Sequence, residues 1–287
     1  GLGYWAAGRI YLRGFQRCQS MGRRTRRFGD TAFDRLLERA LFAAPRPVRL
    51  MVVKDVKNFR RDAVQWSQVS IFFGLLAVYL LNVRRFRYDQ MAESWRNMVS
   101  FLNLAATTLT LSTFTTRFIF PLLSLEGRNF WVLALLPIER RRILHGKFLF
   151  ALGGSLLLSE SLILLSDLML RMPWRMVVLH AYIVLVVCAG LSGLSVGLGA
   201  LYPDLTERNA SKIVSGFGGT LNLLLSMLFL VAVVAMFAVP CHLAFLGRTP
   251  APWLGNYLAM AVVAAAGVGA LVTWLPASPI ADALGLL

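Results

Sequence analysis

The chain has 287 residues, of which 57% are hydrophobic and only 15% are charged, and its mean hydropathy is +0.63. A soluble domain carries about 25% charged residues, so this composition excludes an ordinary soluble protein. The net charge of +16 would suit a nucleic-acid-binding protein, but half of the basic residues lie in residues 1–66 and most of the others flank apolar runs. Because that arrangement fixes membrane topology and no base-reading face is visible, we expect no nucleic-acid partner.

Residues 1–66 are predicted to form a basic cytoplasmic region with amphipathic helices. The apolar opening turns basic at Arg9, which is typical of the inner end of a membrane helix rather than a signal peptide. We therefore expect the chain to be the C-terminal part of a longer protein. Residues 31–44 and 48–61 place apolar and charged side chains on opposite helical faces. The second helix is predicted to lie in the membrane interface, and the alternative is that the two helices pack on each other in the cytosol.

Residues 67–287 are predicted to be a transmembrane domain, because their apolar runs are long enough to cross a hydrocarbon core of about 30 Å. The expected spans are 67–83, 98–117, 148–170, 176–200, 213–239 and 255–275. The fold class is thus all-α, a polytopic bundle of about six transmembrane helices. With residues 1–66 inside, 23 of the 30 Lys and Arg residues lie on the inner side, which favours cytoplasmic positions for both termini.

Two predicted cytoplasmic loops carry the most information. In the first, residues 130–136 are apolar but too short to cross the bilayer, and they follow Glu126, Gly127 and Arg128 and end at Pro137. An apolar patch with a charged rim suggests a docking surface, although the segment also suits packing against neighbouring helices. The second loop, residues 202–212, is short and polar, and on its own it is an ordinary connector.

Together these stretches resemble the permeases of type-two ATP-binding-cassette (ABC) exporters. The resemblance lies in Lys54-Asp55, Arg61-Asp62 and Gln65, Ser124-Leu-Glu-Gly-Arg-Asn-Phe-Trp131, Pro137, Lys147, Gly197-Leu-Gly-Ala-Leu-Tyr-Pro-Asp204 and Asn209-Ala-Ser-Lys-Ile-Val-Ser-Gly216. One departure is Ala63, where the family pattern has Pro. The resemblance implies an ATPase-coupling loop made by Glu126, Gly127, Arg128, Phe130, Trp131 and Pro137, and a second loop with Asp204, Arg208, Asn209 and Lys212. It also implies that replacing Glu126 and Arg128 uncouples ATPase binding without unfolding the bundle.

By the same resemblance the chain is the permease component of an exporter in the plasma (bacterial inner) membrane. It has no Gly-x-x-x-x-Gly-Lys-Ser/Thr phosphate loop, so we expect no enzyme activity and no directly bound cofactor. ATP and Mg²⁺ would be bound by a partner ABC ATPase subunit. The other expected partners are the lipid bilayer and either a second permease half or a second copy of the chain.

Polar residues inside the spans offer a second candidate site. Glu160 lies near the middle of the third span, where a charged side chain is costly and often functional. With Ser159 as a hydrogen-bond partner it is either part of a substrate path or a protonated group that stabilises the bundle. Asp167 is expected to pair with Arg171, one helical turn later, and His180 has no evident partner. The hydroxyl-rich second span, with seven Ser and Thr between residues 107 and 116, is expected to bond back to its own carbonyls.

Two other classes of protein remain open. An ion-coupled secondary transporter would use Glu160 as its proton site and contain inverted repeats, of which we find no convincing example. A membrane-embedded enzyme would need paired catalytic groups at one depth. Glu160 and Asp167 are about 10 Å apart along a helix, which is too far for them to share a proton.

Overall fold

The computed structural model describes Leu37, Arg39 and residues 41–42, 44–83, 93–129, 140–207, 209–245 and 251–274, and every regular element in these ranges is helical. The helices are α3 (Arg46–Arg61), α4 (Ala63–Val83), α5 (Glu93–Phe114), α7 (Arg140–Met169), α8 (Trp174–Leu201), α9 (Ala210–Ser215), α10 (Phe217–Phe245) and α11 (Ala251–Trp274). Helix α5 continues into the π-helical turn η2 (Thr115–Ile119) and the 3₁₀ turns η3 (Phe120–Leu122) and η4 (Ser124–Asn129). The predicted all-α class is confirmed.

Four helical stretches are long and apolar enough to cross a membrane: Trp95–Gly127, Arg141–Met169, Trp174–Leu201 and Phe217–Ala244. The other two predicted spans coincide with α4 and α11, where shorter apolar stretches, Ser67–Val78 and Gly255–Ala270, are described. The chain is therefore a polytopic membrane protein. The first stretch has 33 residues, about 50 Å at the helical rise, so its end turns extend beyond a hydrocarbon core of about 30 Å.

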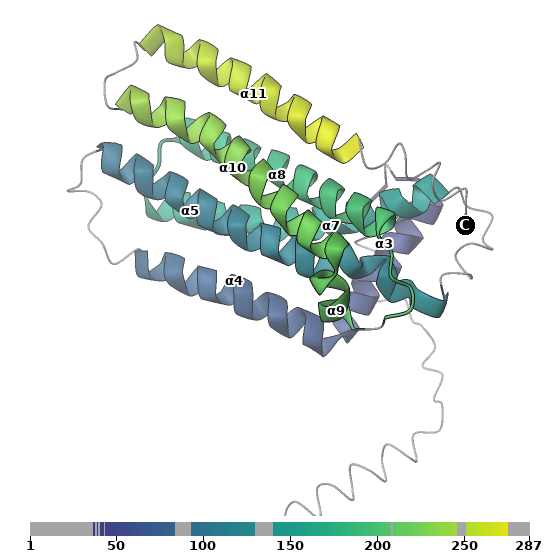
Figure 1. Ribbon diagram of the computed structural model, residues 1–287. Helices are drawn as coiled ribbons and strands as arrows, with labels where there is room; N and C mark the ends of the chain where they lie inside the picture. Colours follow the sequence, from purple (N-terminus) through teal and green to yellow (C-terminus); the bar gives the residue numbers. More distant parts are fainter. Residues whose placement is uncertain are drawn as a thin grey trace, which may run out of the picture. The chain divides into compact units, whose positions relative to one another are not determined.

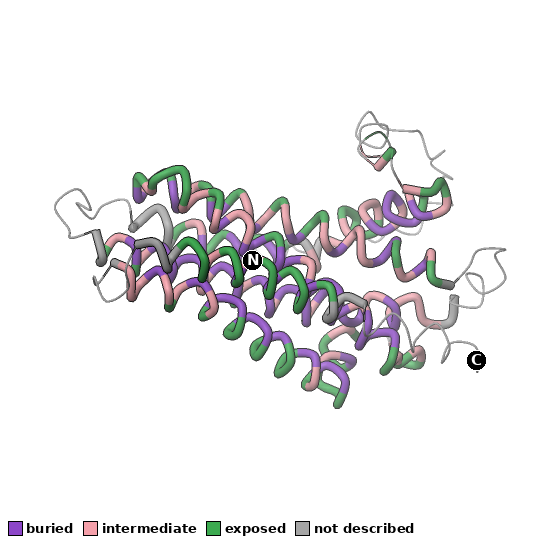
Figure 2. Tube along the Cα trace, turned by 90° about the horizontal axis from the view of Figure 1, so that it is seen from above, coloured by how far each residue is buried: buried purple, intermediate pink, exposed green. Residues whose placement is uncertain are grey.

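The long helices run alongside one another, and α3 and α9 lie at the same end of this bundle (Figure 1). Helix α8 contacts α5, α7, α10 and α11, and its residues Ile183, Val184, Val187 and Leu191 are fully buried. Buried residues lie on the sides of the helices that face their neighbours, and exposed residues lie on the outer sides (Figure 2). A membrane bundle gains little from the hydrophobic effect between helices, so close packing must hold it together.

Two glycines of α8 allow that close packing. A Cβ atom at Gly190 would lie 2.3 Å from the ring of Phe229 in α10, and one at Gly199 would lie 2.3 Å from the carbonyl oxygen of Phe120. The second contact is with backbone, which cannot rotate away. Small residues at helix crossings are the usual means of bringing membrane helices together.

The break between α3 and α4 occurs at Asp62, which has extended backbone angles. Its carboxylate accepts a hydrogen bond from the Gln65 backbone N–H at 3.2 Å and so caps the first turn of α4. Since a capping Asp can begin a helix by itself, the chain turns into the first span without the proline that the family pattern places at Ala63.

The amphipathic helix before the first span is confirmed as α3, and its apolar face is covered by protein. Val48, Met51 and Val52 are buried, and the side chain of Met51 lies against Gly146 of α7, where an added Cβ would be 3.1 Å away. The chain divides into two compact units, Gly1–Phe42 and Ala43–Leu287, so α3 belongs to the unit that contains the membrane helices. Apart from a helical turn in which the Leu41 N–H donates to the Leu37 carbonyl at 3.1 Å, the predictions for residues 1–42 lie outside the described residues.

Candidate functional site: a four-residue ion cluster

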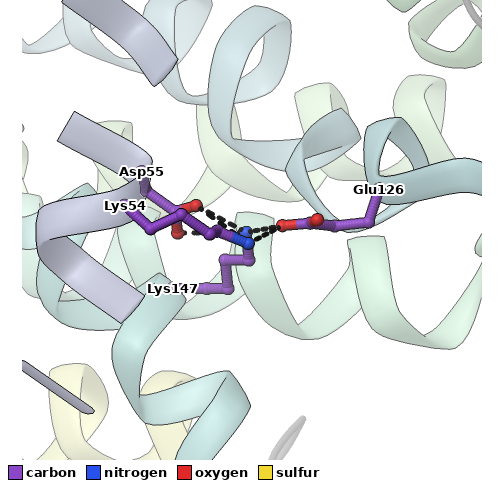
Figure 3. Close-up of polar contacts among 4 residues, drawn as sticks. All are labelled: Lys54, Asp55, Glu126 and Lys147. Atoms are coloured by element: carbon purple, nitrogen blue, oxygen red, sulfur yellow. Dashed lines mark hydrogen bonds and ion pairs between the residues drawn. The ribbon is translucent and has the colours of Figure 1, made fainter. Parts of the chain in front are cut away.

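Four charged side chains from three separate segments meet at one end of the bundle (Figure 3). The Lys147 ammonium group of α7 donates to Glu126 of η4 at 2.6 Å and to Asp55 of α3 at 3.0 Å. Lys54 of α3 also donates to the same Glu126 oxygen, at 2.6 Å. Two cations and two carboxylates therefore form a neutral cluster, which we call the ion cluster.

The ion cluster has a buried side and an open side. The side chains of Lys147 and Asp55 are 4% and 3% exposed, whereas those of Glu126 and Lys54 are 17% and 37% exposed. Burial raises the pKa of the Asp55 carboxyl, and the charges of Lys147 and Lys54 offset this only in part. Burial acts on Glu126 in the same direction, but there the two ammonium groups prevail and hold the pKa of Glu126 below its ordinary value.

Local backbone geometry brings these groups together. Gly127 has φ +51° and ψ −133°, a conformation that only glycine adopts readily. Its turn kinks the chain directly after Glu126, at the point where the carboxylate meets the two lysines. On the other side, Gly146 lets α3 approach α7 closely, so that Asp55 reaches Lys147.

The two predicted cytoplasmic loops are joined to each other. The hydroxyl of Ser124 is buried and accepts a hydrogen bond from the Asp204 backbone N–H at 3.0 Å. The Asp204 carboxylate accepts bonds from the hydroxyl and N–H of Thr206 and from the N–H of Glu207, and these bonds lower the pKa of Asp204. The second loop is therefore an ordered turn that is fastened to the segment carrying Glu126.

The helix after this loop begins with a side-chain cap. Asn209 caps α9 by accepting a bond from the Ser211 N–H at 3.0 Å, and exposed Lys212 pairs with Glu207 at 3.3 Å. Of the predicted loop residues, the structure thus places Glu126 in the ion cluster, Gly127 in the turn, and Asp204, Asn209 and Lys212 at the surface. Phe130, Trp131, Pro137, Arg208 and the side chain of Arg128 lie outside the described residues.

The predicted hydrogen bond between Glu160 and Ser159 does not form. Glu160 is half-buried on α7, whereas Ser159 is fully buried and its hydroxyl makes no hydrogen bond to Glu160. Consecutive residues on a helix point in different directions, which is the reason that the expected hydrogen bond does not form. A role for either residue in a substrate path stays a prediction.

Other expectations for polar residues had mixed outcomes. The hydroxyls of Thr107, Thr108 and Thr110 donate to carbonyls one turn earlier, as expected, whereas the hydroxyl of Ser112 has no partner within the described residues. The prediction for His180 was wrong, because its imidazole lies 2.9 Å from the Asp167 carboxylate. The predicted pair of Asp167 with Arg171 stays a prediction. Asp167 and His180 lie in successive helices joined by a short turn, so a hairpin argument would have found their contact.

Comparison with known proteins agrees with this architecture at the level of family. The sequence matches a family described as "Putative ATP-binding cassette" over residues 2–281, almost the whole chain. No curated protein and no solved structure matches it. The family description names ATP-binding-cassette proteins without naming a permease, and the four membrane-length helices place this member in the membrane. The chain belongs to the putative ATP-binding cassette family and is an ABC-related membrane protein.

Proposed function

We propose that the chain is the permease component of an ABC exporter and that a partner ATPase drives it. The observation that carries this proposal is the ion cluster. It ties η4, in the first predicted cytoplasmic loop, to α3 and α7, and through Lys147 it connects η4 to the start of α7.

The arrangement suits the transmission of force. Glu126 bonds to α3 through Lys54 and to α7 through Lys147, both at 2.6 Å, so a displacement of η4 acts on both helices at once. Helix α7 has 30 residues, about 45 Å, which is enough to carry a movement across the whole bilayer. Because Ser124 holds the Asp204 loop, a partner that pushes on either loop moves both.

We assign ATP hydrolysis to another polypeptide on two grounds. The full sequence contains a single Gly-Lys pair, Gly146-Lys147, and it is followed by Phe148 and lacks the upstream glycine of a phosphate loop. A phosphate loop also connects a strand to a helix, and within the described ranges all regular elements are helical. In this proposal the chain belongs to an ATP-binding-cassette family because it functions together with an ATPase. Both chain termini and the two loops then lie on the cytoplasmic side.

Co-purification tests this proposal. The full-length protein is extracted in mild detergent, and the proteins that accompany it are identified by mass spectrometry. We expect an ATPase that carries a phosphate loop and whose turnover changes when the permease is present. If the folded protein carries no ATPase, the proposal is wrong, and an ion-coupled transporter that uses Glu160 becomes the leading account.

Charge reversal locates the docking surface. Glu126 is unsuitable for this purpose, because its replacement also breaks the ion cluster. Exposed Lys212 beside the second loop is a better choice, and we expect Lys212→Glu to weaken the association with the ATPase. The matched control is Arg175→Glu. Arg175 is an exposed cation in the first turn of α8, whereas the second loop follows the last turn of the same helix. Equal retention of the ATPase by both variants would place the docking surface elsewhere.

A further inference from the structure

Uncharged polar side chains are buried inside the bundle where α5, α8 and α10 meet. The Asn222 amide of α10 donates to the Thr116 hydroxyl of η2 at 2.9 Å and to the Ser195 hydroxyl of α8 at 3.2 Å. Asn222 and Ser195 are fully buried, and Thr116 is 4% exposed. We call these three residues the amide layer.

The amide layer leaves one end of the Asn222 side chain without a partner. Both hydrogens of its Nδ2 atom are used in the two bonds, whereas its Oδ1 atom accepts no hydrogen bond from the described part of the chain. With the amide turned over, Oδ1 would accept from the two hydroxyls and Nδ2 would be left instead. Since an unsatisfied polar group is costly in a membrane interior, either orientation needs a further hydrogen-bonding partner.

Three serines lie on the same helix faces, one helical turn or about 5 Å from the amide layer: Ser112 of α5, Ser192 of α8 and Ser226 of α10. Because α10 begins at the end of the bundle where α5 and α8 finish (Figure 1), all three are displaced in the same direction. They are at most 1% exposed, and their hydroxyls have no hydrogen-bond partner among the residues that the structure describes. We call them the serine layer.

Aromatic residues close this polar region at both ends. Beyond the serine layer, the ring of Phe229 lies so close to Gly190 that a Cβ atom there would overlap it. Beyond the amide layer, the Phe120 backbone leaves no room for a Cβ at Gly199, and the Phe120 ring lies against Gly218 of α10. Two serines occupy less volume than the Phe–Gly pairs on either side, so the serine layer has room for a small molecule but is closed to a large one.

The chemistry of the two layers indicates water as this small molecule. Hydroxyl and carboxamide groups both donate and accept hydrogen bonds, and a buried water needs about two to four such partners. The same oxygen atoms could also ligate a cation. Neither layer contains a carboxylate, however, so the charge of a bound cation would be unbalanced in the membrane interior.

We propose that the serine layer and the Asn222 side chain bind ordered water inside the bundle. This water connects α5, α8 and α10 where their side chains do not bond directly to one another. The site adjoins η2, where the chain leaves α-helical geometry on its way to Glu126, and π-helical turns occur frequently at functional positions. Water can exchange partners when this turn moves, so the buried amide stays hydrogen-bonded. The proposal depends on the packing of the three helices and is independent of the assignment as an ABC permease.

Solid-state NMR of the full-length protein in lipid bilayers tests the proposal. Magnetisation is transferred from water protons to the side-chain amides of deuterated, ¹³C,¹⁵N-labelled protein, and each amide is assigned through its own backbone resonances. The internal control is Asn103 of α5, which is equally buried but whose amide donates to Ser166 at 2.9 Å. We expect transfer at short mixing times to Asn222 and not to Asn103. Equally slow transfer to both would overturn the proposal and would indicate that the serine hydroxyls bond back to carbonyls of their own helices.

A double variant, Ser192→Val with Ser226→Val, tests the location of the water. It fills the serine layer with methyl groups and removes two hydroxyls, so we expect the transfer to Asn222 to be lost. The matched control is Ser161→Val, at an exposed serine of α7, which should leave the transfer unchanged. Transfer that persists in the double variant would contradict the proposed site.

Replacement of sodium by choline in the buffer distinguishes water from a bound cation. We expect the Asn222 side-chain signal and its transfer from water to be the same in both buffers. A signal that shifts when sodium is removed would show that a cation occupies the site, and the proposal would then be wrong.

Discussion

Replacement of Lys147 by Met is the sharpest test of the ion cluster. Methionine keeps a long, unbranched side chain but removes the ammonium group that donates to Asp55 at 3.0 Å and to Glu126 at 2.6 Å. Asp55, whose side chain is 3% exposed, is then left with Lys54 at 3.7 Å as its nearest cation. Breaking a buried ion pair by removing one partner costs about 3–5 kcal/mol, and we expect Lys147→Met to lower the free energy of unfolding by that amount.

The assay is a denaturant titration of the purified protein in mixed micelles, followed by circular dichroism. The control is Lys212→Met, which breaks an ion pair whose lysine is 70% exposed and is therefore expected to cost less than about 1 kcal/mol. A double variant, Asp55→Leu with Lys147→Met, should recover most of the loss, because it removes both buried charges together and leaves Glu126 paired with Lys54. If Lys147→Met costs no more than Lys212→Met, the buried pairing described here is wrong.

Three further predictions follow from the same region. Glu126→Gln should lower stability at neutral pH by about 1–3 kcal/mol. Because the pKa of Glu126 is lowered in the folded protein, the difference from the wild type should begin to shrink as the pH falls below the ordinary pKa of 4.5 and should vanish only below the lowered pKa; an unchanged gap down to about pH 3 would refute this. Gly199→Ala should destabilise by about 1–3 kcal/mol through overpacking, whereas Gly153→Ala, with no atom within 4 Å of the new Cβ, should be neutral or slightly stabilising in the same titration. Ser124→Ala removes the acceptor of the Asp204 N–H, so hydrogen exchange at that amide should accelerate, and an unchanged rate would show that the two loops are not joined by this bond.

The membrane helices could be predicted because span length follows directly from bilayer thickness. Each of the six predicted spans coincides with a helix, although only four meet the criteria of length and composition over the described residues. The amphipathic helix α3 was also predictable from its alternating faces. The packing of this apolar face on α7 was not predictable, because the pattern of apolar and charged residues does not distinguish a lipid surface from the side of another helix.

The ion cluster was only partly predictable. Its residues stood out as parts of family-like motifs, but Lys147 is 92 residues from Asp55 and 21 from Glu126, and no local pattern predicts such contacts. The Gly127 turn gave a usable signal, since a glycine directly after a charged residue in a loop often marks positive φ. The Asp167–His180 contact was missed because an intrahelical pair with Arg171 was preferred to a partner across the hairpin.

The central claim is that this chain moves substrate while another polypeptide binds ATP, and photo-crosslinking with an azido-ATP analogue tests it most directly. The purified full-length protein, with everything that co-purifies, is labelled in the presence of Mg²⁺, and the labelled polypeptide is identified by peptide mapping. The account predicts that the label is on a separate polypeptide with a phosphate loop and that excess ATP prevents the labelling. Label on residues of this chain, again prevented by ATP, would contradict the account and make the chain itself an ATP-binding protein.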